Sequence, residues 1–450
     1  MLSYFYYLFY FLLCFSSLYF INKQRIFLLY PLLFTAQFNV TCFLKAGVTI
    51  SFFELNLIFT TVGILVLKSV KGVPFFDKIF FKKQDKAWLM FLVFCFLSIF
   101  ISILRVNLSD LKPDPDFEPA YYIRGIMSLN KFFFYFPCFY IIRSYLLESC
   151  GNQELKSFFI KAMGWSGLLP ALAVLIQFSG IGFILIHNNP SFAEIFRVET
   201  YTGARPVGLT NEASFFVYQL FFSAMSLYYA WRDNTISKRL FYSLTGIYIF
   251  GVILSLSRTG LLIFALFYLM VWMRESKVFT AKGFFKVLKF LPVIFIVIAV
   301  LSTLNIGGFN LGERVLSSFK SEADLSTIER YGSSKALYAL FFDKSLFFGV
   351  GIYNYQYYVK AYIPAEMNMF YYPKGVAPAS FNFIFELLVE FGLVISMLFF
   401  YYIYLNVFKA KNERFYKDWF LFLCIFSFSF QTLNFAIPFL IFFYPSKIAE

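Results

Sequence analysis

Apolar stretches long enough to cross a lipid bilayer recur along the entire sequence. A transmembrane helix needs about 20 consecutive, mainly apolar residues. Of the 450 residues, 60% are hydrophobic and only 14% are charged, whereas roughly 25% of the residues in soluble proteins are charged. This balance excludes a soluble multidomain enzyme and a disordered protein. It also excludes a nucleic-acid-binding protein, because the net charge of +14 is carried by short segments between apolar stretches.

The hydropathy pattern predicts an all-α integral membrane protein, with a single polytopic membrane domain over residues 1–450. The expected bundle has about 12 transmembrane helices, within a range of about 11 to 14. The spans are expected at residues 4–21, 26–43, 52–68, 87–104, 128–147, 157–186, 212–230, 240–256, 259–273, 290–303, 380–404 and 418–444. The stretch 157–186 exceeds the length of one span, so it must be tilted, broken or partly outside the bilayer.

Lys and Arg in the connecting segments predict which side of the membrane each segment faces. One side is expected to hold residues 22–25, 69–86, 148–156, 231–239, 274–289 and 405–417. With the flanking helix ends, these segments carry more than half of the 39 Lys and Arg residues but only about a third of the 25 Asp and Glu residues. This asymmetry identifies the side as cytoplasmic. The outer side then receives the three longest polar segments, 105–127, 187–211 and the large loop 304–379 before the last two spans.

Four short motifs stand at or near the predicted outer face. The first runs from Arg205 to Ser214 and opens a span, and the second is Ser-Leu-Ser-Arg-Thr-Gly at 255–260. The third begins at Glu329-Arg330 and ends in Gly-Val-Gly-Ile-Tyr-Asn at 349–354. The fourth, at 378–392, contains Ser-Phe-Asn followed by two glutamates and a glycine. Because long loops are usually functional, these motifs are candidates for a site.

Arginines carry the clearest chemical signal in these motifs. Arg258 lies between two spans with almost no connecting loop, so it must lie near the membrane surface beside a helix end. Such a charge is expected to face a polar cavity, an anionic partner or an acidic side chain, with lipid phosphate as the alternative. Arg205 and Arg330 lie in predicted outer loops, where either alone would simply be solvated. Three converging arginines would suit a lipid diphosphate, since a guanidinium binds phosphate oxygens in a bidentate manner.

Carboxylates near the same face are candidates for a general base. Glu212 stands at the start of a span, where partial desolvation makes a carboxylate a stronger base. Capping of the helix N-terminus is the alternative role for Glu212. Glu386 and Glu390 lie four residues apart on one helix face, which favours a structural pairing within the bundle. His187 is the only histidine, which excludes a multi-histidine metal site.

The order of these residues resembles that of the O-antigen polymerase and O-antigen ligase superfamily. The resemblance rests on Arg-x-x-Gly-x-x-x-Glu at 205–212, on Ser-Arg-Thr at 257–259 and on Arg330 roughly twenty residues before Gly-x-Gly. It continues with Asn382, which is followed by Glu-x-x-x-Glu-x-Gly. The resemblance covers about residues 200–405, and the N-terminal part is similar in hydropathy alone.

The resemblance implies an all-helical bundle in the bacterial inner membrane, with an active site that faces the periplasm. It also implies a metal-independent, inverting glycosyltransferase that uses no cofactor and takes a glycan on undecaprenyl diphosphate as its donor. Arg205, Arg258 and Arg330 would bind the diphosphate and stabilise it as a leaving group. Glu212 would act as the base, so that Glu212 and Arg258 are the candidate catalytic residues. Candidate contacts to the acceptor or its sugars are Asn211, Tyr353 and Asn382.

By this resemblance, polymerases and ligases of the superfamily differ in the residue that acts as the general base. Family ligases carry a His directly before the Asn at the start of the late span, where this sequence reads Ser380-Phe381-Asn382. The missing His favours a repeat-unit polymerase over a ligase that acts on a lipid A-core acceptor. A lipid-linked sugar flippase is the non-enzymatic alternative, although the sequence shows no inverted repeat. Expected partners are the lipid-linked oligosaccharide, membrane lipids and a chain-length regulator protein.

Overall fold

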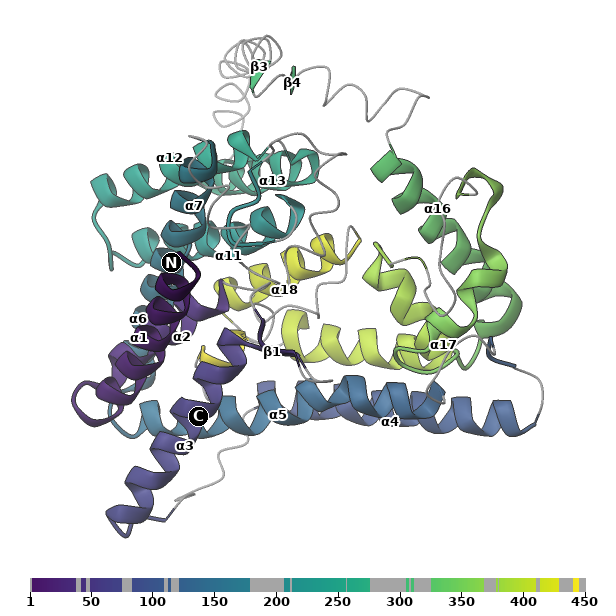
Figure 1. Cartoon of the computed structure of the whole chain (residues 1–450), viewed down its shortest axis with the longest axis horizontal. Helices are drawn as coiled ribbons and strands as arrows, with labels where there is room; N and C mark the ends of the chain where they lie inside the picture. The colour runs from purple at the N-terminus through teal and green to yellow at the C-terminus, as the bar shows by residue number, and fades with distance from the viewer. Residues whose placement is uncertain are drawn as a thin grey trace. The chain divides into compact units, whose positions relative to one another are not determined.

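The fold is known from a computed structural model of the whole chain. It describes residues 2–37, 42–45, 49–74, 83–108, 112–114, 121–178, 206–210, 213–255, 257–275, 305–306, 309–310, 325–367, 378, 380–409, 413–428 and 440–444. These residues form mainly helices (Figure 1), which confirms the predicted helical class. Within these ranges the strands form two short antiparallel hairpins, which the sequence did not predict. They are β1–β2 (Cys42–Lys45 with Thr49–Ser51) and β3–β4 (Asn305–Ile306 with Phe309–Asn310).

The chain folds into two compact units. Unit 1 comprises Met1–Thr60 with Ser157–Ala323, and unit 2 comprises Thr61–Lys156 with Asp324–Glu450. Unit 1 holds α1 (Leu2–Asn22), α2 (Leu29–Ala36), α7 (Leu168–Phe178), α11 (Ala213–Arg232), α12 (Lys238–Leu254) and α13 (Arg258–Glu275). Unit 2 holds α4 (Lys83–Asn107), α5 (Tyr121–Leu147), α16 (Leu325–Leu340), α17 (Phe383–Ile403) and α18 (Arg414–Ser427). Two of the three boundaries between the units fall within α3 (Phe52–Val70) and α6 (Asn152–Ser166), and the third falls between Ala323 and Asp324, just before α16.

Unit 1 is built around α11. Every residue of this helix from Ala213 to Ala230 is buried, apart from the half-buried Phe215. A helix that is covered on all sides is a core helix, and α11 packs against α7, α12 and α13. The approach of α7 is close because Gly167 precedes it: a Cβ atom at Gly167 would lie 2.5 Å from the Cβ of Ser223 on α11.

Unit 2 is built around the packing of α4 against α5 and α17, which lie along one another in Figure 1. Helices α4 and α17 run antiparallel, since Phe91 lies near Phe399 while Ser98 lies near Glu390. The ring centroids of Phe91 and Phe399 are 5.4 Å apart, and the hydroxyl of Ser98 donates a 2.8 Å hydrogen bond to the carbonyl oxygen of Glu390. This packing places α4 alongside the fourth sequence motif.

Contacts at the two ends of these helices agree with the predicted grouping of the connecting segments. At one end, the ammonium of Lys156 pairs with the carboxylate of Glu413 at 2.7 Å, which joins two predicted cytoplasmic connections. At the other end, the amide of Asp114 donates a 2.8 Å hydrogen bond to the carbonyl of Tyr357, which joins two predicted outer segments. The assignment of these ends to the cytoplasm and the periplasm stays a prediction.

Four helical stretches among the described residues are long and apolar enough to cross a membrane: Phe52–Val70, Leu89–Asn107, Asn152–Phe178 and Phe383–Lys409. Shorter apolar helices are Phe11–Asn22, Arg25–Ala36 and Phe133–Leu147. The chain is therefore a multi-pass helical membrane protein. A total of about 12 spans stays a prediction, and the expected span at 290–303 lies outside the described residues.

Two expected spans differ in detail from the structure. The helix expected at 26–43 ends at Ala36, and Cys42–Lys45 forms a strand, because a short apolar run alone does not distinguish helix from strand. The long stretch 157–186 is broken at Gly167 into α6 and α7. The segments 187–211 and 304–379 stay predicted periplasmic loops; residues 187–205 lie outside the described residues, and α16 lies within 304–379.

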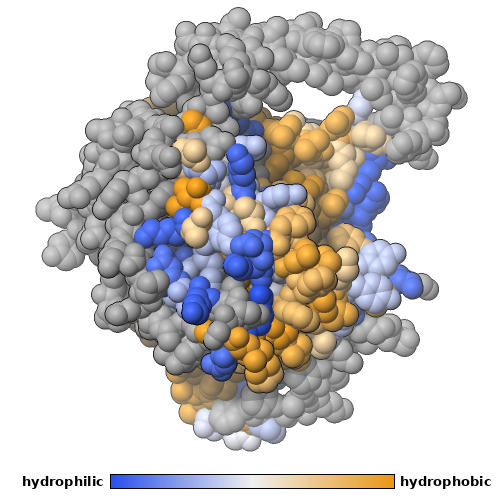
Figure 2. Space-filling model, turned by 90° about the vertical axis from the view of Figure 1, so that its right-hand side faces the viewer, coloured by the Kyte–Doolittle hydropathy of each residue, from blue (hydrophilic) through white to orange (hydrophobic). Residues whose placement is uncertain are grey.

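Hydrophobic residues form a broad area on one face of the molecule, beside a strip of hydrophilic residues (Figure 2). The described helices expose large apolar side chains, among them Val93, Phe96 and Phe100 on α4 and Met397 and Leu398 on α17. A soluble protein rarely exposes large apolar patches, whereas a helix that faces lipid must expose them. The exposed apolar faces thus agree with a membrane location.

Candidate functional site

The first motif forms a tight turn that packs onto the start of α11. Gly208 has φ +65°, and a Cβ atom there would lie 2.5 Å from Cδ2 of Phe216. The hydroxyl of Thr210 closes the turn with a 2.8 Å hydrogen bond to the carbonyl of Val207. Only glycine combines this left-handed backbone with so close an approach to a ring. The conformation of the turn therefore explains the glycine of the Arg-x-x-Gly motif.

Gln177, in the last turn of α7, binds the same turn through its side-chain amide. Its Oε1 accepts hydrogen bonds of 2.9 Å from the amides of Val207 and Gly208. Its Nε2 donates a 2.6 Å hydrogen bond to the carbonyl of Gly208. One side chain thus satisfies three backbone groups of the motif. The sequence analysis did not identify Gln177, which lies about thirty residues before the turn and carries no local signature.

The second motif begins α13. It packs onto Val217 of α11, the residue next to the Phe216 that the first motif contacts. The hydroxyl of Ser257 accepts a 3.3 Å hydrogen bond from the amide of Gly260, which caps the helix. Arg258 is the first residue of α13 and is half-buried. A Cβ atom at Gly260 would overlap the side chain of Val217. Because Phe216 and Val217 are adjacent, the first two motifs meet at one turn of α11.

Several of the predicted site residues in unit 1 lie outside the described residues, namely Arg205, Asn211, Glu212 and His187. The described turn at 206–210 and the start of α11 at Ala213 flank the first three of them. Their roles stay predictions. For Arg258, the structure shows a half-buried side chain at a helix start, close to the turn that follows Arg205.

In unit 2, the third motif fills a break in the helix that carries the fourth motif. Gly392 interrupts α17 with φ +70° and ψ +174°, a non-helical conformation that breaks the series of backbone hydrogen bonds along the helix. The amides of Val350 and Gly351 donate hydrogen bonds of 3.0 and 2.9 Å to the carbonyls of Val389 and Glu390. Beyond the break, the amides of Leu393 and Val394 donate to the carbonyls of Leu346 and Phe347, at 2.8 and 3.2 Å. Backbone groups freed by the break are therefore bonded by the inserted segment.

Glycines make this insertion possible. A Cβ atom at Gly349, where φ is +71°, would overlap the backbone carbonyl of Glu390. A Cβ atom at Gly392 would overlap backbone atoms of Phe347, Phe348 and Gly349. Neither clash could be relieved by a side-chain movement, because both partners are backbone. The Gly-x-Gly and the Glu-x-Gly of the sequence are thus two halves of one backbone contact.

Arg105, in the last turn of α4, supports the inserted segment from the other side. Its Nη1 donates a 2.6 Å hydrogen bond to the carbonyl of Gly349, and its Nη2 donates one of the same length to the carbonyl of Lys344. The sequence analysis missed this residue. An arginine that ends an apolar span is common, and nothing local indicates partners that lie more than two hundred residues away.

The start of α17 brings Arg330 and the Ser-Phe-Asn sequence together. The guanidinium of Arg330, on α16, lies over the ring of Phe381 at 5.4 Å from its centroid. The side-chain oxygen of Asn382 accepts a 3.1 Å hydrogen bond from the amide of Phe385 and caps α17. The structure thus gives Asn382 a capping role, and its predicted contact with the acceptor stays a prediction.

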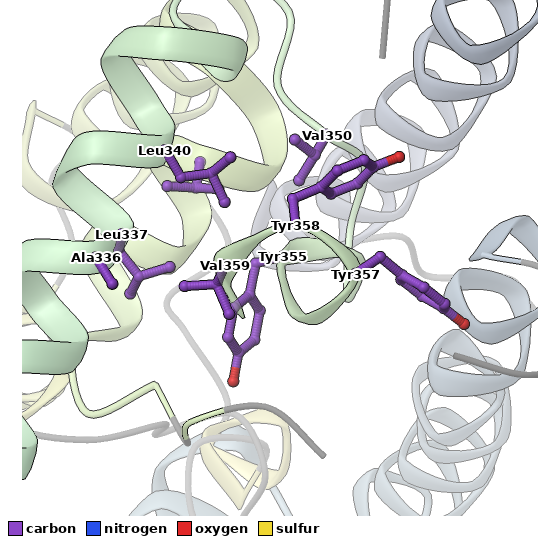
Figure 3. Close-up of a cluster of buried hydrophobic side chains, with 9 residues drawn as sticks. Ala336, Leu337, Leu340, Val350, Tyr355, Tyr357, Tyr358 and Val359 are labelled. Atoms are coloured by element: carbon purple, nitrogen blue, oxygen red, sulfur yellow. The ribbon is translucent and has the colours of Figure 1, made fainter. Parts of the chain in front are cut away.

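Packing in the third motif sets the position of the helix that carries Arg330. A buried cluster connects α16 to the segment after Gly351 (Figure 3), and comprises Ala336, Leu337, Leu340, Val350, Tyr355, Tyr357, Tyr358, Val359 and Val389. The hydroxyl of Tyr355 also accepts a 3.0 Å hydrogen bond from the amide of Ser380. The residues that follow the third motif therefore pack on α16 and bond to the residues just before α17.

Tyr353 follows the inserted segment and interacts electrostatically with two buried carboxylates, those of Glu386 and Glu390. It is half-buried and has φ +60°, which is rare for a residue with a side chain. Glu386 and Glu390 are each only 1% exposed. Burial raises the pKa of Tyr353 well above its usual value, and the charges of Glu386 and Glu390 raise it further. The phenol is therefore protonated at neutral pH and can donate a hydrogen bond.

Metal ligands are not grouped in the described part of the chain. Within these residues there is no group of three or more His, Cys, Asp or Glu side chains that could hold a metal ion. The chemistry that the described motifs offer is instead cationic, through Arg258 in unit 1 and Arg330 in unit 2. Guanidinium groups of this kind suit phosphate oxygens. Their joint binding of one diphosphate stays a prediction.

The described residues thus define a multi-pass helical membrane protein in which each unit carries an arginine and glycine-dependent turns among its motifs. Residues 243–400 match the family model described as O-antigen ligase. This segment, about a third of the chain, contains Arg258, Arg330, the Gly-x-Gly insertion and most of the broken helix α17. The match confirms the resemblance to the O-antigen polymerase and ligase superfamily. No curated protein and no solved structure matches the chain significantly.

The family domain supports a role in the synthesis of O antigen or a related glycan, and suggests a glycan-processing enzyme. The match does not distinguish a polymerase from a ligase.

Proposed function

We propose that this protein is a repeat-unit polysaccharide polymerase. It transfers a growing glycan from undecaprenyl diphosphate to a lipid-linked repeat unit at the periplasmic face of the bacterial inner membrane. The observation that carries the proposal is the O-antigen ligase family domain at 243–400 with phenylalanine at position 381. Family ligases, by the resemblance described above, have their histidine at this position.

The environment of Phe381 supports a polymerase rather than a ligase. A phenyl ring has no nitrogen that could accept a proton from an acceptor hydroxyl. Instead, its face lies against the guanidinium of Arg330. Such a cation–π contact holds the arginine in place without neutralising its charge. Position 381 thus orients a diphosphate-binding group, and the base has to come from another residue.

The reaction we propose is a single displacement with inversion. The acceptor hydroxyl oxygen attacks the anomeric carbon of the donor, and the bond between that carbon and the diphosphate oxygen breaks. The diphosphate leaves with the bonding electrons, and the carboxylate of Glu212 takes the hydroxyl proton. Arg205, Arg258 and Arg330 stabilise the negative charge that grows on the leaving group. Because guanidinium groups provide this charge, the reaction needs no metal ion.

Ligase activity is the second candidate, because the description of the matching family favours it. A ligase would transfer finished polymer to a lipid A-core acceptor and would not lengthen lipid-linked chains. The two activities are separated by the acceptor that the purified protein uses. A polymerase elongates undecaprenyl diphosphate-linked repeats, whereas a ligase needs lipid A-core.

The test uses the full-length protein in lipid nanodiscs with a lipid-linked repeat unit as both donor and acceptor. We expect a ladder of lengthened lipid-linked products from the wild-type protein. Arg258→Ala and Arg330→Ala should each lower the transfer rate by about a hundredfold or more, as expected when a group that stabilises a leaving anion is lost. Arg239→Ala is the matched control, because Arg239 is exposed in the first turn of α12. Full activity of both site variants would overturn the proposal.

A further inference from the structure

We infer that Arg105 is a positioning residue: it holds the Gly349–Tyr353 turn in the break of α17 and so orients Tyr353 toward a sugar of the acceptor. This inference rests on the proposed function, since the acceptor is the lipid-linked repeat unit. Neither the family match nor the sequence motifs assign a role to Arg105.

The two hydrogen bonds of Arg105 use the fork of the guanidinium group on backbone carbonyls. Both are 2.6 Å long, and their acceptors are Lys344 and Gly349. Lys344 belongs to the π-helical turn Phe341–Ser345 at the end of α16, where helix carbonyls are left without helical partners. A cation at such a helix end is favourable. An arginine at the end of a span, which could have bound lipid phosphate, thus holds a loop instead.

The turn that Arg105 holds has an unusual backbone. Gly349, Gly351 and Tyr353 have φ values of +71°, +93° and +60°. A tyrosine in the left-handed region is strained, and such strain persists only where the surroundings determine the conformation, most often at functional sites. The surroundings here are the break of α17 on one side and Arg105 on the other. Loss of Arg105 would remove one of these two constraints on the turn.

Helix α4 supplies a second support in the same place. The hydroxyl of Ser98 bonds to the carbonyl of Glu390, which also accepts the amide of Gly351. A Cβ atom at Gly351 would lie 2.7 Å from the hydroxyl oxygen of Ser102. The turn is therefore confined along one face of α4. Arg105 provides the contact nearest to the end of that helix.

Tyr353 is the residue whose chemistry depends on this support. The residue is half-buried and its phenol is protonated at neutral pH, so the hydroxyl can donate a hydrogen bond to an oxygen atom of a sugar. A tyrosine ring also offers an apolar face to a sugar ring. If the turn relaxes, the tyrosine can leave the left-handed conformation and its hydroxyl group moves. Acceptor binding should then weaken while donor binding is kept.

The experiment compares wild-type protein with Arg105→Ala and Arg105→Lys in nanodiscs, with Arg239→Ala as the control. In Arg105→Ala we expect the KM for the acceptor to rise about tenfold, as a lost charge-assisted contact implies, with the KM for the donor unchanged. Millimolar guanidinium chloride should restore much of the acceptor affinity, because Arg105 is only half-buried and its site is open to solvent. Arg105→Lys should lie between wild type and Arg105→Ala.

A second readout does not depend on catalysis. Amide hydrogen exchange at Val350 and Gly351 should rise about tenfold or more in Arg105→Ala, while exchange in α18 stays unchanged. Unchanged exchange and unchanged KM values in that variant would overturn the inference. Failure of the proposed function looks different: the wild-type protein would form no products, although Arg105→Ala would still raise exchange at these amides.

Discussion

The replacement Gly392→Ala tests the central structural feature of unit 2, the insertion of residues 346–351 into the break of α17. Gly392 has φ +70°, and an added Cβ atom would overlap backbone atoms of Phe347, Phe348 and Gly349. A backbone with φ +70° and ψ +174° is almost restricted to glycine, and it costs an alanine at least about 1–2 kcal/mol. The backbone overlap must also push the inserted segment away and break at least two of the four bridging hydrogen bonds, at about 1 kcal/mol each. The expected loss of stability is therefore about 3–4 kcal/mol.

Other glycines of the chain separate these two contributions. Gly72 also has a positive φ, of +63°, but an added Cβ atom would meet no atom within 4 Å, so Gly72→Ala should cost only the roughly 1–2 kcal/mol of backbone strain. Gly246 lies within α12 and has open space around it, so Gly246→Ala should stabilise the protein by up to about 1 kcal/mol through helix propensity. The three variants should therefore rank in the order Gly246, Gly72, Gly392.

The assay is thermal unfolding of purified protein in detergent micelles, followed by intrinsic fluorescence, with hydrogen exchange to locate the change. A loss of about 3–4 kcal/mol should lower the apparent Tm by roughly 6–16 °C for a unit of this size. Exchange should rise at the amides of Val350, Gly351, Leu393 and Val394. If Gly392→Ala behaves like Gly72→Ala, the inserted segment does not confine the break and the reasoning is refuted.

Three further predictions concern the chemistry. Glu212→Gln should abolish chain growth, because a side-chain amide cannot take the proton from the attacking hydroxyl group. The control is Glu154→Gln, at an exposed position in α6, which should leave chain growth unchanged. Near-normal chain length in Glu212→Gln would show that Glu212 is not the base. Phe381→Leu should raise the KM for the donor about twofold to thirtyfold through loss of a contact worth about 0.5–2 kcal/mol, whereas Phe381→Trp should keep the contact and the KM. Equal KM values in the wild-type protein and Phe381→Leu would show that the ring does not position Arg330. Added EDTA should leave the transfer rate unchanged, since arginines bind the diphosphate, and a loss of activity that Mg²⁺ restores would contradict a metal-independent reaction.

Hydropathy predicted many of the long helices that the structure describes, because a transmembrane helix must be apolar over its whole length. The starts of α3, α11 and α13 lie within a residue of the expected ones. The break at Gly392 could not be located in this way. The segment that fills the break lies more than forty residues earlier in the chain, so the sequence around Gly392 does not reveal it.

The candidate site was predictable in part. The motifs pointed to Arg258 and Arg330 through their charge at a membrane surface, and the family match contains both. What the sequence could not show is which motifs meet. Phe216 and Val217 of α11 receive the first two motifs, and nothing in their identity indicates that they do.

The residues that hold the motifs in place could not be predicted from the sequence either. Gln177 and Arg105 act on backbone groups, and backbone acceptors leave no signature in a sequence. A glutamine at the end of an apolar helix and an arginine at the end of a span are ordinary residues. Their roles follow from contacts that exist only in the folded chain.

The most direct test of the proposed function is the lipopolysaccharide profile of the host bacterium after deletion of this gene. A repeat-unit polymerase predicts a profile that collapses to core carrying a single repeat unit, with the ladder restored by the wild-type gene and not by one encoding Arg258→Ala. Loss of all capped core, with long polymer kept on undecaprenyl diphosphate, would contradict the account in favour of a ligase. Loss of all capped core with only single lipid-linked repeats retained would indicate a flippase, and an unchanged ladder would contradict a role in this polymer.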